Sequence, residues 1–230
     1  MVITLKKLKE LISWKFFFFI VVTIILTNIP IIGNYVKIIN TVFHESGHAL
    51  IALLGGKVHH ISLFGNTEGV TYTSHSSWLG GFFTGISGYV FSSLMAFVSL
   101  WLISRKKNKS LIIILLLFVV VNLVFWVRNF YGLFWLVSFG TVFLLLLYKG
   151  SGAIVQNCLL LIASILLVES VSSSFTILLL SFVQSHAAGD ATGLANATGF
   201  IPAQVWGLFF FGQAIAFLFF GFRTRAYRIM

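Results

Sequence analysis

The chain consists of long apolar runs separated by short polar segments. Runs of spanning or near-spanning length cover residues 16–32, 38–54, 78–103, 111–127, 130–148, 153–183 and 200–221. Because about 20 apolar residues cross a bilayer as a helix, this pattern predicts an all-α polytopic membrane protein with about 6–7 hydrophobic spans. Residues 1–15 mix apolar and basic positions, and we expect them to form an amphipathic segment at the membrane interface.

Two segments break the helical pattern. Residues 56–73 are rich in β-favouring residues around Gly65-Asn66, a turn signal, and they predict a β-hairpin. Residues 185–199 are small and polar and are unsuited to contact with lipid. Irregular polar backbone at membrane depth has to face protein or a water-filled cavity. We therefore expect both segments to line one site.

Composition agrees with a membrane domain and excludes a soluble one. Hydrophobic residues make up 59% of the 230 positions, charged residues make up 9%, and the mean hydropathy is +1.03. Soluble domains are typically about a quarter charged. The length predicts a single membrane-embedded domain over residues 1–230. The first run ends without a small-residue cleavage site, which favours a retained anchor over a signal peptide.

The formal net charge of +10 comes from clusters that flank the apolar runs. These clusters are Lys6, Lys7, Lys9 and Lys15, then Arg105, Lys106, Lys107 and Lys109, and finally Arg223, Arg225 and Arg228. Such placement is typical of charges that fix topology and meet anionic headgroups, and it argues against a nucleic-acid partner. Three runs separate the first two clusters. Either one run is re-entrant or one basic cluster lies outside the cytoplasm.

The run 38–54 contains the sequence His44-Glu45-Ser46-Gly47-His48. Two histidines four residues apart share one helix face, where their imidazoles can bind one zinc ion. Glu45 lies next to the same face and can act as general base towards a water molecule that the metal activates. Three ionisable groups inside a membrane helix are costly and indicate a functional site.

A catalytic zinc needs a third protein ligand and an open position for water. Asp190 is the leading candidate because it is the sole Asp of the chain and lies in the polar segment 185–199. Glu169, within the run 153–183, is the next candidate. Glu68 in the hairpin and His186, four residues before Asp190, are further alternatives.

Glycines in the run 78–103 permit helices to approach closely. Gly81 and Gly85 are four residues apart, and Ser87-Gly88 follows them. Small residues at this spacing are typical of helix–helix contacts in membranes. They predict packing within the bundle, without chemistry of their own.

The segment from His44 to Leu50, followed by Gly55-Gly56-Lys57-Val58 and Gly69-Val70-Thr71, resembles the site-2 protease family of intramembrane zinc metallopeptidases. It is most similar to a compact bacterial branch of that family. The similarity extends to the segments 85–89, 126–129, 189–191 and 198–202, and to Trp206.

The resemblance implies that His44, His48 and Asp190 bind Zn²⁺ and that Glu45 is the general base. It also implies substrates that are membrane-embedded protein or peptide segments, and a location in a bacterial cell membrane.

The chain departs from better-studied members before Asp190. It lacks their Asn-x-x-Pro stretch, so the Asn that would polarise the substrate carbonyl has no counterpart at that place. Asn196 is our candidate for this support, with His186 as a possible second group near the metal. Asn122, Asn129 and Arg128 are alternatives, although Arg128 and Asn129 fit better at the interface between two spans.

Three functions compete at this point. The sequence favours an intramembrane zinc endopeptidase in which the edge of the hairpin holds an extended substrate by strand addition. The alternative for the hairpin is a plain connector. The alternative for the whole chain is a non-proteolytic zinc-binding membrane regulator of the same fold. A metal transporter fits poorly, because the chain carries just five acidic residues.

Overall fold

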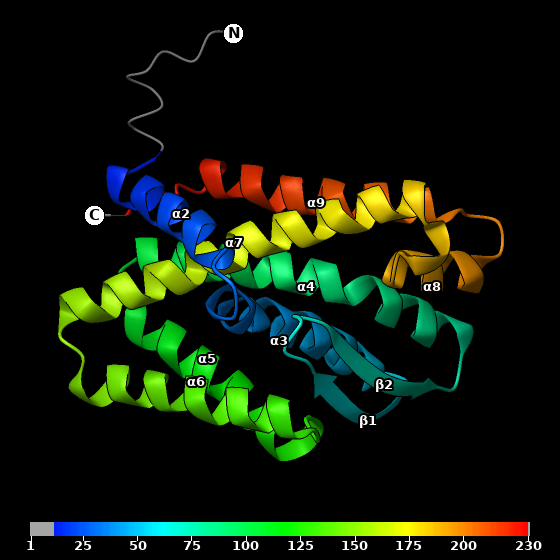
Figure 1. The fold of residues 1–230 in the computed structure, drawn as a ribbon, viewed down its shortest axis with the longest axis horizontal. Coiled ribbons are helices and arrows are strands. Elements are labelled where there is room, and N and C mark those ends of the chain that lie inside the picture. The colour runs from blue at the N-terminus through cyan, green and yellow to red at the C-terminus, as the bar shows by residue number, and fades with distance from the viewer. Residues whose placement is uncertain (1–11, 230) are drawn as a thin grey trace, which may run out of the picture.

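The computed structural model describes residues 12–229, and these are mostly helical with one two-stranded antiparallel sheet (Figure 1). Most of the expected interfacial segment 1–15 lies outside the described residues. The elements, in chain order, are α2 (Trp14–Thr27), α3 (Ile32–Ala52), β1 (Gly56–Leu63), β2 (Gly69–His75), α4 (Trp78–Ser104), α5 (Asn108–Val121), the π-helix η1 (Asn122–Trp126), α6 (Phe130–Lys149), α7 (Gly152–Val183), the 3-10 helix η2 (Ser185–Ala187), α8 (Asp190–Thr198) and α9 (Ala203–Arg223).

Five helical segments are long and apolar enough to cross a membrane: α4, α5 with η1, α6, α7 and α9. The helices α2 and α3 meet this condition only together, and they are bent by 112° at their junction. With 14 residues, α2 is about 21 Å long, short of a bilayer core of about 30 Å. The protein is therefore a multi-pass membrane protein. When the bent pair is counted as one span, the protein has up to six spans, which agrees with the expected 6–7.

The bend between α2 and α3 has a local cause. Pro30 follows the last turn of α2, and its ring cannot continue a helix. Ile31 has a φ of 67°, a conformation that β-branched side chains avoid. At the end of α2, the Ile24 carbonyl accepts hydrogen bonds from the side-chain amide of Asn28 at 2.7 Å and from the Thr27 hydroxyl at 3.3 Å. The first two apolar runs are thus two halves of one broken element.

When α2 and α3 are counted as one broken element, most of the basic residues lie at the same end of the bundle. Both termini of the described chain, the α4–α5 junction and the α6–α7 junction lie at one end of the bundle, on the left of Figure 1. The basic residues in these segments are Lys15, Arg105, Lys106, Lys107, Lys109, Lys149, Arg223, Arg225 and Arg228. The other described basic residues are Lys37, Lys57 and Arg128. By the positive-inside rule, we expect the basic end to face the cytoplasm.

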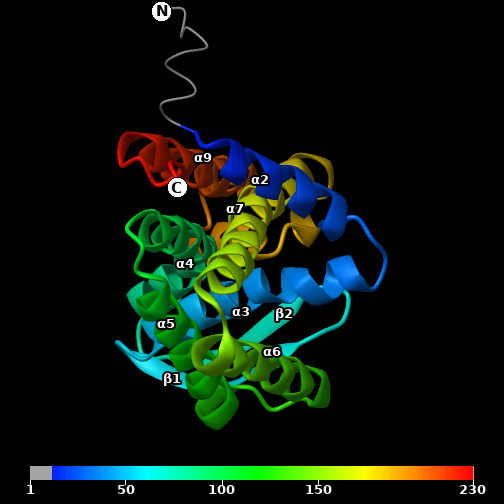
Figure 2. The same ribbon diagram turned by 90° about the vertical axis from the view of Figure 1, so that its left-hand side faces the viewer.

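The helices form layers around α7. In Figure 2, α2 and α9 lie on one side of α7, and α3 and α4 lie on the other, with the hairpin beside α3. The contact between α3 and α4 is unusually close at Gly47. A Cβ at this position would lie 2.7 Å from the Phe91 Cβ and 2.9 Å from the Ser87 carbonyl oxygen. Glycine therefore lets α4 approach the helix face that carries the two histidines.

The hairpin forms where the sequence predicts it, with strands that pair from Gly56–His75 to Leu63–Gly69. The outer edge of β1 is covered. Asn129 accepts a hydrogen bond from the Leu63 amide at 3.0 Å and donates one to the Leu63 carbonyl at 2.6 Å. Among the described residues, β2 has no strand on its other side. One free strand edge is thus left beside α3.

The orientation can be tested with single cysteines in a Cys158→Ser background. Asn196→Cys places a thiol on the exposed surface of α8, and Ser110→Cys places one at the basic end of α5. Because the basic end is expected in the cytoplasm, a membrane-impermeant maleimide applied to intact cells should label the Asn196→Cys variant. It should label the Ser110→Cys variant only after permeabilisation. The reverse pattern would show that the basic end lies outside.

Candidate metal centre

Three possible metal-ligand atoms converge from two distant parts of the chain. His44 and His48 lie one turn apart on α3, and Asp190 is the first residue of α8. The two Nε2 atoms are 3.0 Å apart, and Asp190 Oδ2 lies 3.1 Å from His44 Nε2 and 3.2 Å from His48 Nε2. In the described part of the chain, no other group of three His, Cys, Asp or Glu side chains meets in this way.

The geometry of these atoms fits a zinc ion. Zinc–nitrogen and zinc–oxygen bonds of about 2.0–2.1 Å in a tetrahedron place neighbouring ligand atoms roughly 3.3 Å apart, close to the separations of these three atoms. Asp190 Oδ2 is shielded from solvent and has no hydrogen-bond partner within residues 12–229. A carboxylate oxygen without a donor is expensive to bury unless a cation faces it. The donor set therefore matches a metal site.

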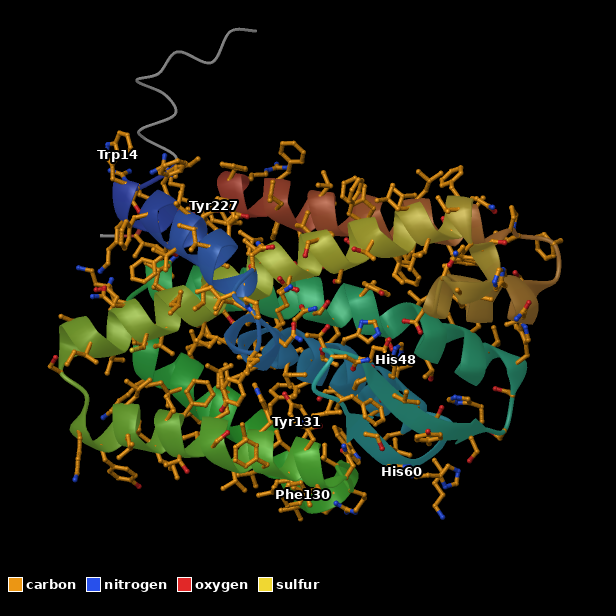
Figure 3. All side chains as sticks on the ribbon, in the orientation of Figure 1. Trp14, His48, His60, Phe130, Tyr131 and Tyr227 are labelled. Atoms are coloured by element: carbon orange, nitrogen blue, oxygen red, sulfur yellow. The ribbon has the colours of Figure 1, made fainter. Side chains whose placement is uncertain are left out.

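The orientation of His48 also favours metal binding. Its Nδ1 lies 2.6 Å from the Thr84 carbonyl oxygen on α4. Because a carbonyl only accepts, Nδ1 carries a proton, and in the neutral ring the lone pair of Nε2 then faces His44 and Asp190. A backbone partner of this kind is typical of metal-binding histidines, because it fixes both the tautomer and the ring orientation. Figure 3 shows His48 in the interior, between α3 and α4.

Asp190 reaches the histidines because the segment before α8 turns sharply. Gly189 has a φ of 51°, which is costly for other residues. Thr192 Oγ1 accepts a hydrogen bond from the Ala188 amide at 3.0 Å and donates one to the Ser185 carbonyl at 2.6 Å. These bonds tie the turn to the first turn of α8. Asp190 thus faces the cavity, as expected for the polar segment 185–199.

Glu45 is buried beside the histidines and is held by the hairpin. Thr71 Oγ1 on β2 donates a hydrogen bond to Glu45 Oε2 at 2.6 Å. Gly69 packs against the same side chain, and a Cβ there would lie 2.8 Å from Glu45 Oε1. The hairpin therefore fixes the carboxylate next to the possible metal ligands, which a plain connector would not do.

Two residues of α4 shape the site in a way that the sequence did not indicate. A Cβ on Gly88 would lie 2.6 Å from His44 Nε2 and from His48 Nε2, so the missing side chain makes room for both imidazoles. The Tyr89 ring packs edge-on against His44 with ring centroids 4.5 Å apart. The small-residue pattern predicts packing alone. At Gly88, the group that packs against the glycine is the imidazole pair of His44 and His48.

These groups open onto a cavity of about 880 Å³ between α3, β2, α4, α7 and α8. Glu68 and Glu169 line it but lie outside the ligand group. Asn196 and His186 are exposed and do not line it.

The remaining alternatives make structural contacts. Asn122 donates to Ser46 Oγ at 2.8 Å, and Arg128 binds carbonyls at the end of η1. Asn129 holds β1, as described above.

A protein-family model described as Peptidase M50B-like matches residues 17–221, nearly the whole chain. The chain belongs to the Peptidase M50B-like family. This family is related to the site-2 proteases, so the chain is a metallopeptidase with the His-Glu-x-x-His arrangement on α3. Comparisons with curated proteins and with solved structures found no match.

The match ends at residue 221, within α9, so it covers both segments of the ligand group. The two histidines and Asp190 all lie within the matched range. The resemblance drawn from the sequence is confirmed at the level of the family.

Gly88→Ala tests the packing of the imidazole pair. The added methyl group should force the imidazoles of His44 and His48 apart and weaken metal binding by about 10–100-fold, as changes next to metal ligands commonly do. Metal affinity of the purified protein, measured by competition with a chelating dye, checks this effect. Gly193→Ala is the matched control, because Gly193 lines the same cavity and its Cβ would meet nothing within 4 Å. Equal affinities for the two variants would contradict the packing argument.

Proposed function

We propose that this protein is an intramembrane zinc metalloendopeptidase that cleaves membrane-embedded protein segments. The observation that carries the proposal is the convergence of His44, His48 and Asp190 beside the buried Glu45. Their cavity lies within a bundle of membrane-spanning helices. Membership in a metallopeptidase family supports the same conclusion.

In this proposal, zinc is held by Nε2 of both histidines and by a carboxylate oxygen of Asp190. When bound, the ion acts as a Lewis acid towards water and the substrate carbonyl. Two neutral imidazoles and one carboxylate leave a net positive site, which favours a developing negative charge on the peptide oxygen. Asp190 comes from a separate helix, so the site is complete only when α8 is packed against α3 and α4.

Glu45 serves as the general base. Its carboxylate takes a proton from the attacking water and delivers it to the leaving nitrogen, so that both new termini are formed without free acid or base. The hydrogen bond from Thr71 keeps one oxygen in place and leaves the other for proton transfer. Glu45 is 5% exposed, so bulk water has little access to its carboxylate.

The free edge of β2 is the proposed substrate-binding edge. A helical segment hides its amides in internal hydrogen bonds, so cleavage requires an extended stretch. Thr71 and Thr73 of β2 line the cavity beside Glu45. An extended segment paired with β2 would lie across the metal centre, while the covered edge of β1 keeps the hairpin in position.

Glu45→Gln separates proteolysis from metal binding. The amide keeps the size of the side chain but cannot act as a base, so cleavage of a panel of membrane-segment peptides in detergent should fall by at least about 100-fold. Zinc content, measured by mass spectrometry of the purified proteins, should be the same as in the wild type. If the wild type binds zinc and cleaves no peptide, the non-proteolytic alternative is favoured instead.

Asp190→Ala tests the third ligand. Loss of one of three ligands should reduce bound zinc to well below one ion per chain after dialysis. Glu169→Gln is the matched control, because Glu169 lines the same cavity outside the ligand group and its substitution should leave zinc unchanged. The opposite result, in which the Glu169→Gln variant loses zinc and the Asp190→Ala variant keeps it, would transfer the ligand role to Glu169.

A further inference from the structure

The cavity continues beyond the metal centre along one face of α3. Lys37, Asn40 and Thr41 line it, one and two turns before His44. The facing wall is α7, whose cavity-lining polar residues are Glu169, Ser172, Ser173 and Thr176. The cavity is therefore polar well past the three possible ligands.

Asn40 is a buried polar residue in this part of the cavity that lacks a partner, as does the Ser173 hydroxyl on the facing wall. Asn40 is 7% exposed, and its Oδ1 is shielded from solvent without a hydrogen bond. No hydrogen bond of its amide nitrogen is found within residues 12–229 either, although Asn40 lines the cavity. Buried amides are normally bonded, and an exception requires an explanation.

Two oppositely charged groups near Asn40 interact only at a distance. Lys37 and Glu169 line the same end of the cavity, and neither forms an ion pair within 4 Å among the described residues. A lipid chain would leave all of these groups unsatisfied. The occupant that suits them carries both donors and acceptors, as a peptide backbone does.

Asn40 lies at a suitable distance from the reaction. Side chains four residues apart on a helix have Cβ atoms about 5–6 Å apart, and an extended chain advances about 3.3 Å per residue. Asn40 is four residues before His44, so it faces the substrate within about two residues of the cleaved bond. A primary amide offers one donor side and one acceptor side, which match the C=O and N–H groups of a peptide.

We propose that Asn40 binds the substrate backbone by accepting from a peptide N–H and donating to a peptide C=O near the cleaved bond. The substrate then lies between the free edge of β2 and the Asn40 face of α3. This inference rests on the proposed endopeptidase function. It adds a substrate-binding residue that belongs neither to the ligand group nor to the proton transfer.

The test uses Asn40→Leu in a Glu45→Gln background, where peptide can bind without being cleaved. The probe is a fluorescent form of the panel peptide that the wild type cleaves fastest. Loss of the amide should raise its Kd by about tenfold. Zinc content should not change, and the melting temperature in detergent should stay the same or rise, because an unpaired amide is removed. A residue that merely supports the fold would instead lower the melting temperature.

Thr176→Val is the matched control for shape and polarity. Thr176 lines the same cavity, but its hydroxyl already donates to the Ser172 carbonyl at 3.0 Å, so its loss should leave the peptide Kd unchanged. Asn40→Ala is the second variant if the leucine does not fold.

An unchanged Kd for both Asn40 variants would overturn the inference while leaving cleavage by the wild type intact. Absence of any cleavage by the wild type would instead refute the proposed function, and this inference with it.

Discussion

The structure depends on three possible metal-ligand atoms, from His44, His48 and Asp190, that lie close together. Such an arrangement is unfavourable without a cation between them. Two imidazole nitrogens and a carboxylate oxygen lie within 3.2 Å of one another, inside a helical bundle. Each nearby element contributes to this arrangement. The face of α3 supplies the histidines, Thr84 and Gly88 of α4 orient and accommodate them, and the turn at Gly189 directs Asp190 inward. A metal ion turns this costly arrangement into a stable one.

The same centre explains why polar groups are tolerated at membrane depth. Glu45 and His48 are nearly inaccessible, yet Glu45 is hydrogen-bonded to Thr71 and His48 to Thr84. Their partners come from β2 and α4, so the hairpin and the helix pair are part of the centre as well as of the fold. Asn40, by contrast, is buried without a partner. The hydrogen bonds of Glu45 and His48 are made within the fold. In our proposal, the unpartnered amide of Asn40 binds the substrate instead.

Much of this could be predicted from the sequence, because the signals were local. The helical runs, the hairpin around Gly65 and the His44–His48 pair each depend on neighbouring residues, and the family match supports the resemblance built on them. Asp190 is expected from its place as the one carboxylate in a polar segment that has to face a cavity, and its role as a ligand stays a prediction. The broken element α2–α3 was less evident, because the basic clusters indicated a re-entrant run as one of two possibilities without showing which run it was or that a 112° bend joins the first two.

What the sequence could not indicate depends on contacts between distant elements. Gly88 looked like a packing residue, and only its position over both imidazoles gives it a role in the site. Asn129 looked like an interfacial residue, and its two hydrogen bonds to Leu63 require the hairpin to lie beside it. Asn196 is the candidate that its closeness to Asp190 in the sequence suggests, and no sequence signal pointed to Asn40. Asn196 proved exposed, while Asn40 shares the helix face of His44.

The central claim is that His44, His48 and Asp190 bind zinc, and X-ray absorption at the zinc edge tests it most directly. For the purified wild-type protein, the account predicts a first shell of nitrogen and oxygen at about 2.0–2.2 Å with the outer-shell scattering of two imidazoles. A sulfur shell at about 2.3 Å, which in this chain would come from Cys158 or a methionine, would contradict it. A first shell without imidazole would contradict it equally.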